Sequence, residues 1–423
     1  MTYLIWILAL LVLILVHELG HFSVARLVGA KATRFLVGFP PVALSFRRGE
    51  TEYGIGMIPL GGYVRIVGMN RPMPEDAIIC QDAIEEIDLR RPEGQRDLLG
   101  PATATLKSAI AHDASPAECQ TAADRAVLAL DADQHLLHPK TYKETRKNLE
   151  RLRDDLDRRA YWRLPVWKRI SIILAGPGAN VLAALVILTI FFWHGYPIQK
   201  TTTAVSSAAG APAVAAGLKP GDTITAVNGH SVHGDWTLVG NDIQAAKGAP
   251  VTLTVERDGA TQTLPAVKPQ LVNGRWLVGF TFEQVPAGTK RESLPAAAAS
   301  SASMSWLITR ESVAGLTRIV TTSDGHNQVS SVVGITQQGA QSVRNGSFLW
   351  MLGVISLALA IFNLLPFLPL DGGHVVVALA EKLRHGRPLS RVLIERISIV
   401  GIAIVMVLFV IGLNNDISRF TGP

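Results

Sequence analysis

The stretch His17-Glu18-Leu19-Gly20-His21 lies inside an apolar run that covers residues 2–28. On a helix, positions i and i+4 project from one face, so both imidazoles can reach the same metal ion. The glutamate between them would lie beside a water molecule at that ion and can act as a general base. A charged group deep in a membrane span costs about 2.5–3.5 kcal/mol on insertion scales, so three ionisable groups in five residues predict a functional metal site. The alternative is polar packing between helices, or a helix end at the membrane interface.

The composition indicates a membrane protein. Of the 423 residues, 48% are hydrophobic and only 17% are charged, with a mean hydropathy of +0.28, whereas soluble domains carry about 25% charged residues. This hydrophobicity excludes a disordered chain, and a count of two cysteines excludes a disulfide scaffold. The net charge is +6, but the basic residues flank apolar runs instead of forming one stripe. The sequence therefore predicts no direct nucleic-acid partner.

Four apolar runs reach the roughly 20 residues that a helix needs to cross a bilayer core. They cover residues 2–28, 170–193, 348–367 and 393–413. Inside lipid such runs must be helical, because a helix satisfies its own backbone hydrogen bonds. A signal peptide is the alternative for the first run, but no basic segment precedes it and no small-residue cleavage site follows it. The expected fold class is a polytopic α-helical membrane protein with about four transmembrane helices.

Lysine and arginine residues near the ends of these runs indicate which side of the membrane is cytoplasmic. None precedes the first run. The residues that mark the cytoplasmic side are Arg26, Lys31, Arg34, Arg163, Lys168, Arg169, Lys382, Arg384, Arg387, Arg391 and Arg396. They predict that the N-terminus, residues 197–345 and the C-terminal tail are extracytoplasmic.

Two polar segments separate the apolar runs. The cytoplasmic one contains an expected surface helix over residues 141–159, with Leu149, Leu152 and Leu156 on one stripe, and ends in an aromatic and basic interfacial anchor. Its residues 75–138 carry no interpretable motif, and Cys80 and Cys119 are expected to be free thiols.

The outer polar segment alternates apolar strands with turn signals such as Asn228-Gly229 and Asp258-Gly259. This pattern predicts a compact β-rich domain whose only helix lies around residues 236–247. An Ala/Ser-rich linker is expected over residues 295–303.

The third apolar run offers a third metal ligand, which a catalytic zinc site needs beside one open position. Its end reads Asn363-Leu-Leu-Pro-Phe-Leu-Pro-Leu-Asp371-Gly-Gly-His374. Prolines and glycines break the helix around an acid, and an unwound backbone at membrane depth is tolerated only where it lines a cavity or is buried in protein. Asp371 is the preferred ligand and His374 the second choice. An ordinary turn after a helix is the alternative.

These motifs together resemble the site-2 protease family of intramembrane zinc metalloproteases, most closely its bacterial regulator-of-sigma-E protease branch. Residues 57–68 resemble the family's membrane re-entrant β-hairpin, and residues 167–180 resemble the start of its second span. Residues 217–229 resemble its inserted PDZ domain, and residues 333–339 the stretch before its third span. The chain departs from the enterobacterial branch in having one PDZ-like unit instead of two, and its long cytoplasmic insert matches nothing in the family pattern.

The resemblance implies a role for each matching residue. The ligands of Zn²⁺ would be His17, His21 and Asp371, and Glu18 would activate the water. The substrate-binding residues would be Asn363, Pro366, Gly61, Gly62 and Tyr63, the last three as a strand to which an unwound substrate adds. The PDZ groove would be formed by Gly217, Leu218, Ile224 and Val227. An ordinary turn at residues 61–63, and a PDZ unit that excludes bulky substrates without binding peptide, are the alternatives.

The expected organisation assigns every part of the chain. Its parts are a first span 1–29, a hairpin region 30–69, a cytoplasmic insert with an interfacial helix 70–169, a second span 170–194, an extracytoplasmic PDZ domain 200–285, an extracytoplasmic linker 286–346, a third span 347–374, a cytoplasmic loop 375–391, a fourth span 392–414 and an extracytoplasmic tail 415–423.

The resemblance implies a zinc-dependent endopeptidase of the bacterial inner membrane, with its active site toward the cytoplasmic side. Its substrates would be single-span membrane proteins that are first cut outside, such as anti-sigma factors, or remnant signal peptides. A non-catalytic PDZ membrane scaffold is the main alternative, but a structural metal site would not need Glu18 as a base. A zinc transporter is the third hypothesis, and it would need neither a PDZ domain nor a re-entrant hairpin.

Overall fold

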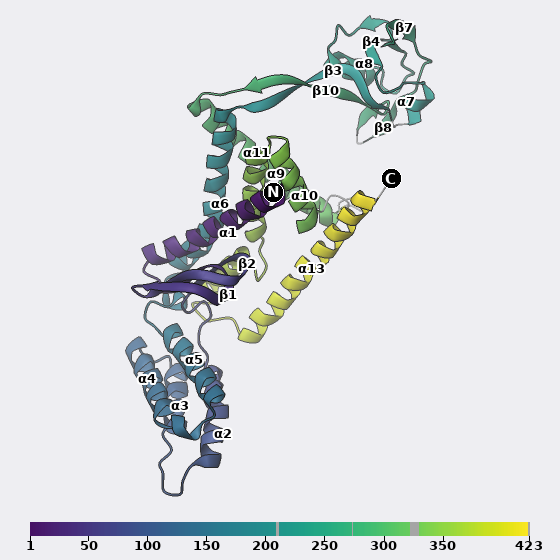
Figure 1. The fold of residues 1–423 in the computed structure, drawn as a ribbon. Coiled ribbons are helices and arrows are strands. Elements are labelled where there is room, and N and C mark those ends of the chain that lie inside the picture. Colours follow the sequence, from purple (N-terminus) through teal and green to yellow (C-terminus); the bar gives the residue numbers. More distant parts are fainter. Residues whose placement is uncertain (209–210, 273, 322–329, 422–423) are drawn as a thin grey trace. The chain divides into compact units, whose positions relative to one another are not determined.

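The computed structural model describes residues 1–208, 211–272, 274–321 and 330–421 (Figure 1). The chain divides into two compact units. One contains Met1–Ile190 together with Pro295–Pro423, and the other contains Phe191–Leu294. The residues predicted to bind a metal all belong to the first unit.

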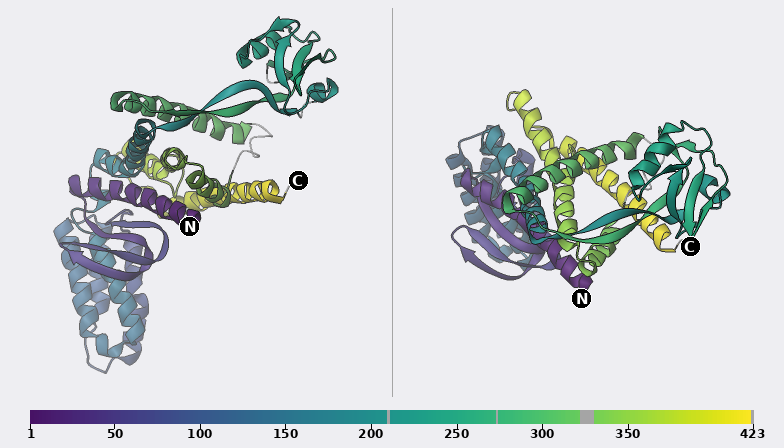
Figure 2. Two further views of the ribbon diagram at one scale, coloured as in Figure 1. Left: turned by 45° about the horizontal axis from the view of Figure 1, so that its top comes forward. Right: turned by 90° about the horizontal axis from the view of Figure 1, so that it is seen from above.

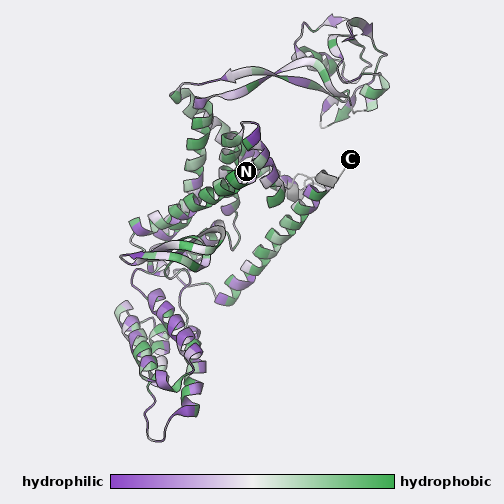
Figure 3. Ribbon diagram, viewed as in Figure 1, coloured by the Kyte–Doolittle hydropathy of each residue, from purple (hydrophilic) through white to green (hydrophobic). Residues whose placement is uncertain are grey.

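Three apolar helices are long enough to cross a membrane. They are α1 (Thr2–Leu27), α6 (Val166–His194) and α13 (Arg391–Thr421), whose apolar part extends to Ser418. Figure 3 shows apolar residues along most of these helices and along α11 (Phe348–Asn363). Because α13 continues to Thr421, no separate tail begins at residue 415.

The expected third span is not one helix. Helix α11 has only 16 residues and ends at Asn363, before the two prolines of the segment that follows. A second helix, α12 (Asp371–Leu383), starts at the predicted ligand and continues into the expected loop. The span expected over residues 347–374 therefore consists of α11, an irregular segment and the start of α12. The break lies at the predicted prolines, because Pro366 and Pro369 cannot donate the backbone hydrogen bonds of a continuous helix.

Strands β1 (Ala32–Arg48) and β2 (Thr51–Ile66) form a bent antiparallel hairpin. Residues 34–37 of β1 pair with residues 52–55 of β2 on one side and with residues 62–65 on the other. The hairpin thus folds back on itself. Its last strand segment, residues 62–66, lies at an edge next to α1, because a Cβ at Gly62 would meet the Glu18 side chain.

The insert between the hairpin and α6, in which only the last helix was predicted, is a helical bundle. The two views of Figure 2 show its helices gathered beside the hairpin. Its elements are η1 (Pro74–Cys80), α2 (Gln81–Arg90), α3 (Leu99–Ala111), α4 (Pro116–Ala132), η2 (Gln134–Leu136) and α5 (Pro139–Asp155).

The bundle has its own hydrophobic core. The predicted stripe of Leu149, Leu152 and Leu156 is buried in it, as are Cys80 and Cys119. Both cysteines are free thiols, as expected. Burial raises the pKa of the Cys80 thiol to about 11, so this thiol stays protonated and behaves as a small apolar side chain.

Several polar contacts attach the bundle to the hairpin and to the end of α1. The Lys31 ammonium donates to Asp154 at 2.9 Å and to Asp157 at 3.1 Å, and the Gly68 amide donates to Asp155 at 2.9 Å. Residues on both sides of the hairpin are thereby held to the C-terminal end of α5.

The second unit is β-rich, as predicted. Its main sheet has the strand order β10-β3-β4-β6-β7, with β5 paired to β4, and a separate ribbon joins β8 and β9. The strands are β3 (Tyr196–Ala208), β4 (Thr223–Val227), β5 (His230–Ser231), β6 (Leu253–Arg257), β7 (Ala260–Thr263), β8 (Gln270–Val272), β9 (Arg275–Leu277) and β10 (Phe280–Lys290). The predicted helix is present as α8 (Trp236–Ala245), and a short helix that the sequence did not predict, α7 (Ala211–Ala215), precedes β4.

A buried ion pair closes one end of this sheet. The Asp222 carboxylate accepts from Arg257 Nε and Nη2 at 2.6 Å each, and from the Lys219 amide at 2.8 Å. The Arg257 guanidinium holds the pKa of Asp222 below its usual value. The Lys219–Asp222 turn before β4 is therefore held by three hydrogen bonds to one carboxylate.

The expected Ala/Ser-rich linker is helical. Residues 295–303 form the start of α9 (Leu294–Thr321), and a further helix, α10 (Val332–Arg344), precedes α11. Alanine is the strongest helix former, and Ser301 on α9 donates to the Leu185 carbonyl of α6 at 2.8 Å. The low-complexity composition was misread as a linker because it lacks the apolar periodicity of a surface helix.

We predict that Leu149→Ala destabilises the insert by about 2–5 kcal/mol, because it removes a fully buried side chain from a packed core. Leu149 is 0% exposed, whereas Leu128 on α4 is 67% exposed. Hydrogen exchange of the purified protein should show faster exchange across residues 74–155 in Leu149→Ala and no change in the matched variant Leu128→Ala. Equal exchange in both variants would contradict a cooperative core.

Candidate metal centre

Three side chains from distant parts of the first unit converge at one point. The ligand atoms of His17, His21 and Asp371 all lie within 4.8 Å of one another. The Asp371 Oδ2 atom lies 3.1 Å from His17 Nε2 and 3.3 Å from His21 Nε2. Asp371, the residue preferred at the sequence level over His374, is thus the acid that faces both imidazoles.

Helix α1 supplies the two histidines with the spacing that one metal ion requires. Their Nε2 atoms are 3.2 Å apart, and both side chains are buried. The local reason is the helical repeat, which brings positions i and i+4 to one face.

Helix α6 orients both rings from the opposite side. The His21 Nδ1–H donates to the Ile172 carbonyl at 2.8 Å, and the Asn180 side-chain amide lies 3.2 Å from His17 Nδ1. An amide can present either its oxygen or its nitrogen after a half-turn. With the oxygen toward the ring it accepts the Nδ1 proton, which leaves the Nε2 lone pair free to bind a metal.

Neither contact was predicted from the sequence. Asn180 belongs to residues 167–180, which resemble the start of the family's second span. The resemblance implies no catalytic or metal-orienting role for Asn180. A buried polar residue in an otherwise apolar span was the available signal. The role of the Ile172 carbonyl could not be predicted from the sequence, because every residue has a backbone carbonyl.

The start of α12 fixes Asp371. A Cβ at Gly372 would collide with the Leu364 and Leu365 carbonyl oxygens, and one at Gly373 would collide with the backbone around Phe367 and Leu368. Only glycine lets the first turn of α12 approach the preceding segment this closely. The two glycines after Asp371 therefore set the position of the carboxylate.

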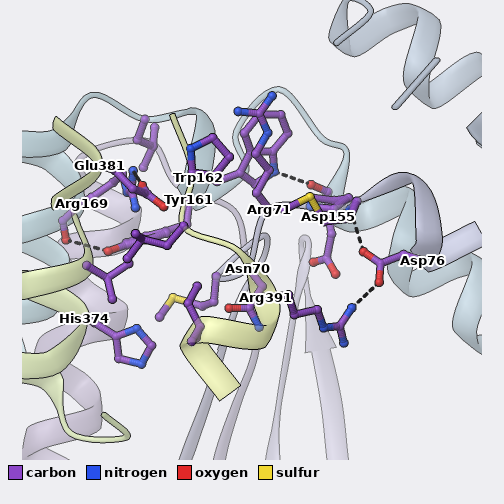
Figure 4. Close-up of a pocket in the computed structure, with 18 of the residues that line it drawn as sticks. Asn70, Arg71, Asp76, Asp155, Tyr161, Trp162, Arg169, His374, Glu381 and Arg391 are labelled. Carbon is purple, nitrogen blue, oxygen red and sulfur yellow. Dashed lines mark hydrogen bonds and ion pairs between the residues drawn. The ribbon is translucent and has the colours of Figure 1, made fainter. Parts of the chain in front are cut away.

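A buried ion pair holds the other end of α12 to α6. The Arg169 Nη1 atom lies 2.7 Å from Glu381 Oε2, and both side chains are largely buried. The Arg169 guanidinium also lies 5.0 Å from the centre of the Tyr161 ring. Figure 4 shows Arg169, Glu381 and Tyr161 together on one wall of a cavity of about 620 Å³, with His374 on the same side.

The residues present fit a metal ion. A Cβ at Gly176 would collide with His21 Nε2 and would lie only 2.8 Å from His17 Nε2, so the absent side chain leaves space in front of both ring nitrogens. The Asp371 Oδ2 atom faces the same two nitrogens at 3.1 Å and 3.3 Å, so the three ligand atoms point toward one another. Two imidazoles and one carboxylate, with room for a fourth ligand, match the donor set of catalytic zinc sites.

Glu18 is part of α1, and its side chain lies between this helix and the hairpin. Its side chain packs against Gly62, where a Cβ would come within 2.5 Å of Glu18 Cγ. Glycine at position 62 therefore allows the edge strand of β2 to pass directly beside the predicted base.

The residues predicted to bind substrate belong to two parts of the chain, the hairpin and the end of α11 with the segment that follows it. Gly61 and Gly62 are buried, and Tyr63 is half-buried, on the edge strand. Asn363 ends α11, where its side-chain amide donates to the Leu359 carbonyl at 3.0 Å, and Pro366 lies in the segment between α11 and α12. Their contact with a substrate stays a prediction.

The predicted PDZ residues belong to the second unit. Leu218, Ile224 and Val227 are buried in its hydrophobic core, and Gly217 lies in the turn before β4 with a positive φ of 74°. The side chains of the three apolar residues are therefore core residues in this structure, and the peptide groove stays a prediction.

The fold and this site define a membrane metallopeptidase, and comparison with known proteins identifies its family. Residues 5–408 match peptidase family M50. The chain is 30% identical to the zinc metalloprotease RasP of Geobacillus kaustophilus, over 96% of each chain. It is 26% identical to the regulator of sigma-W protease RasP of Bacillus subtilis, over 96% of each chain. It is 28% identical to the metalloprotease MmpA of Caulobacter vibrioides, over 97% of this chain and 93% of that protein.

The chain therefore belongs to peptidase family M50, the site-2 protease family, and is an intramembrane zinc metalloprotease. This confirms the family, the enzyme class and the cofactor inferred from the sequence motifs.

We predict that Gly176→Ala lowers the affinity for zinc by at least about tenfold, because the added methyl group occupies the space in front of both Nε2 atoms. The matched variant is Gly178→Ala on the same helix, where a Cβ would meet no atom within 4 Å. Zinc retained by the purified variants during a chelator titration, measured by atomic emission, checks this. Equal retention by the two variants would contradict the assigned position of the metal.

The Arg169–Glu381 pair yields a second prediction. Glu381→Gln leaves Arg169 as a buried, uncompensated charge, which should displace α12 and weaken zinc binding through Asp371. In an Asp371→Asn background the same change should lower zinc affinity no further, because effects transmitted through one residue are not additive. Glu150→Gln breaks an exposed pair of the same 2.7 Å length on α5 and serves as the control. Additive losses in the double variant would show that Glu381 acts only on general stability.

Proposed function

We propose that this enzyme cleaves peptide bonds of transmembrane segments within the bilayer, with His17, His21 and Asp371 as the zinc ligands and Glu18 as the general base. The observation that carries the proposal is the convergence of the three ligand atoms within 4.8 Å, at buried positions of apolar helices. Membership in peptidase family M50 supplies the reaction class.

A zinc ion held by these residues supplies Lewis acidity to the scissile carbonyl and to the attacking water. Glu18 takes the proton of that water at a carboxylate oxygen and returns it to the leaving amide nitrogen. Asn180 and the Ile172 carbonyl hold the imidazole rings with Nε2 toward the reaction centre. The surrounding apolar helices keep bulk water away, which strengthens each electrostatic interaction.

The hairpin edge is the proposed substrate-binding element. A helical substrate hides its peptide bonds, so a segment must be unwound and held as an extended chain. Residues 62–66 pair with β1 on one side only in the described chain, so their other edge is free to pair with such a segment. Gly62 brings this edge beside Glu18, which favours cleavage of a chain bound there. Gly61, Tyr63, Asn363 and Pro366 are the further proposed substrate contacts.

The arrangement relative to the membrane is part of the proposal. The basic residues at the helix ends support a cytoplasmic insert and an extracytoplasmic N-terminus and β-rich unit. We take α11 with the following segment as the fourth crossing, because α11 is apolar and the turn after it packs its backbone closely on Gly372 and Gly373 at the start of α12. The β-rich unit would act as a PDZ domain that either binds a peptide end at the Gly217 turn or excludes uncut substrates by size.

The proposed substrates are single-span proteins of the bacterial inner membrane that another protease has already cut outside. The name of the Bacillus subtilis relative, regulator of sigma-W protease, supports anti-sigma factors as candidates. Remnant signal peptides are a second candidate class.

We predict that Glu18→Gln abolishes cleavage of a tagged single-span substrate and leaves the zinc content nearly unchanged, because the base is lost and the ligands are kept. Immunoblots of product and metal analysis of the same preparations provide both measurements. Unchanged product formation would favour the scaffold or transporter hypotheses, in which Glu18 has no chemical role.

A further inference from the structure

A charged groove lies between the hairpin and α5, and the proposed proteolytic mechanism does not use it. Its volume is about 690 Å³. Seven lysine and arginine residues and four aspartate and glutamate residues line it. The groove joins the hairpin to the insert, which is the part of the chain that the family pattern leaves unexplained.

The four carboxylates of this groove are already neutralised. Each of them forms an ion pair with a lysine or arginine. The pairs are Glu50–Arg159, Glu52–Arg34, Glu150–Arg146 and Asp154–Lys31. Among the residues that line the groove, no carboxylate is left over to balance further positive charge. Outside the lining, the Asp155 carboxylate attracts Arg65 but accepts its hydrogen bond from the Gly68 amide.

Four cations of the groove remain unpaired. Within the described parts of the chain, the side chains of Arg47, Arg65, Lys147 and Arg151 form no ion pair and no hydrogen bond. Arg47 and Arg65 project from the two strands, and Lys147 and Arg151 lie one helical turn apart on α5, so that they share a face. Four like charges around one concavity create a positive potential that attracts an anion.

The surface of the hairpin suits a position of this groove at the depth of lipid headgroups. Beyond the groove its strands expose large apolar side chains to the surroundings, with Leu44 72% and Met57 64% exposed, which suits the membrane interior. Phe46, 65% exposed, lines the groove and stacks on Tyr53 with ring centres 5.5 Å apart. Arg47 and Arg48 follow directly. An apolar surface that changes to aromatic and then to basic residues along one strand is typical of the membrane interface.

We propose that this groove binds the phosphate-bearing headgroup of an anionic phospholipid. The unpaired lysine and arginine side chains would contact the phosphate, and the lipid chains would lie against the exposed apolar side chains of the hairpin. A free phosphate compound shares the charge but has no apolar part to match that surface. The bound lipid would bridge the hairpin and α5 and so hold the insert against the membrane surface. This function does not depend on the proteolytic reaction.

The test uses the full-length protein, delipidated in a neutral maltoside detergent. The variant Lys147→Gln/Arg151→Gln removes two exposed, unpaired cations of the groove. The control Lys140→Gln/Lys143→Gln removes two exposed cations of the same helix that do not line the groove. Native mass spectrometry counts bound lipid during titrations with phosphatidylglycerol or phosphatidylcholine, and a parallel arm adds inorganic phosphate as a competitor.

We expect the wild type to bind phosphatidylglycerol at least tenfold more tightly than phosphatidylcholine. The groove variant should lose about 30-fold in phosphatidylglycerol affinity, since each cation near the membrane surface contributes about a factor of five to the attraction of anionic lipid. The control should bind like the wild type, and equal melting temperatures of the lipid-free proteins should show that both variants are folded.

Three results would overturn the proposal. Equal affinity for the two lipids would show that the groove does not select an anion. An equal loss in the control would show that only overall charge matters. Displacement of phosphatidylglycerol by inorganic phosphate at comparable concentration would show that the ligand is a soluble phosphate compound.

Discussion

The close approach of α1 and α6 is the constraint on which the catalytic site depends. A Cβ at Gly20 would collide with the Ala175 carbonyl, and a Cβ at Gly176 would collide with both histidine rings. Two glycines, one on each helix, therefore let the backbones approach until Ile172 and Asn180 reach the imidazoles. If larger residues separated the helices, the hydrogen bonds that orient both rings would be lost at once.

The third ligand depends on a break in an apolar segment. Helix α11 is joined to α6 by the Ser356 hydroxyl, which donates to the Asn180 carbonyl at 2.8 Å. The chain then turns and restarts as α12 at Asp371. In a continuous helix Asp371 would lie further along the axis of α11, away from the histidines. The turn between α11 and α12 instead places Asp371 next to both histidine rings. Within this turn the Leu364 and Leu365 carbonyl oxygens lie directly against Gly372, so the close approach of the two backbone segments holds Asp371 in place.

The insert and the hairpin extend this arrangement toward the polar side of the membrane. Lys31, just after α1, links the end of the histidine helix to Asp154 and Asp157 of the insert. The hairpin then runs from this charged junction to the edge strand beside Glu18. The helix that carries the histidines, the strand proposed to bind substrate and the insert therefore form one continuous chain of contacts.

Features that depend only on neighbouring residues, such as helical spacing and helix-breaking residues, could be predicted from the sequence alone. The spacing of His17 and His21 predicts a shared helical face, and the acid among prolines and glycines made Asp371 the preferred third ligand over His374. The candidate metal ligands could therefore be named from the sequence. Patterns without such local constraints were misread or left open. Residues 295–303 were taken as a linker although they are helical, and residues 75–138 gave no signal for a bundle whose core is built mainly of alanine and leucine.

The sequence by itself determined the membrane character, the metal-binding residue types and the family, because charge, helical spacing and helix-breaking residues act locally. The tertiary structure decided which buried groups orient the histidines, where α12 begins, and which charges of the groove are already paired. These properties depend on contacts between residues more than a hundred positions apart, such as His21 with Ile172 and Arg169 with Glu381. No local pattern encodes such distances, since they follow from how closely the helices pack.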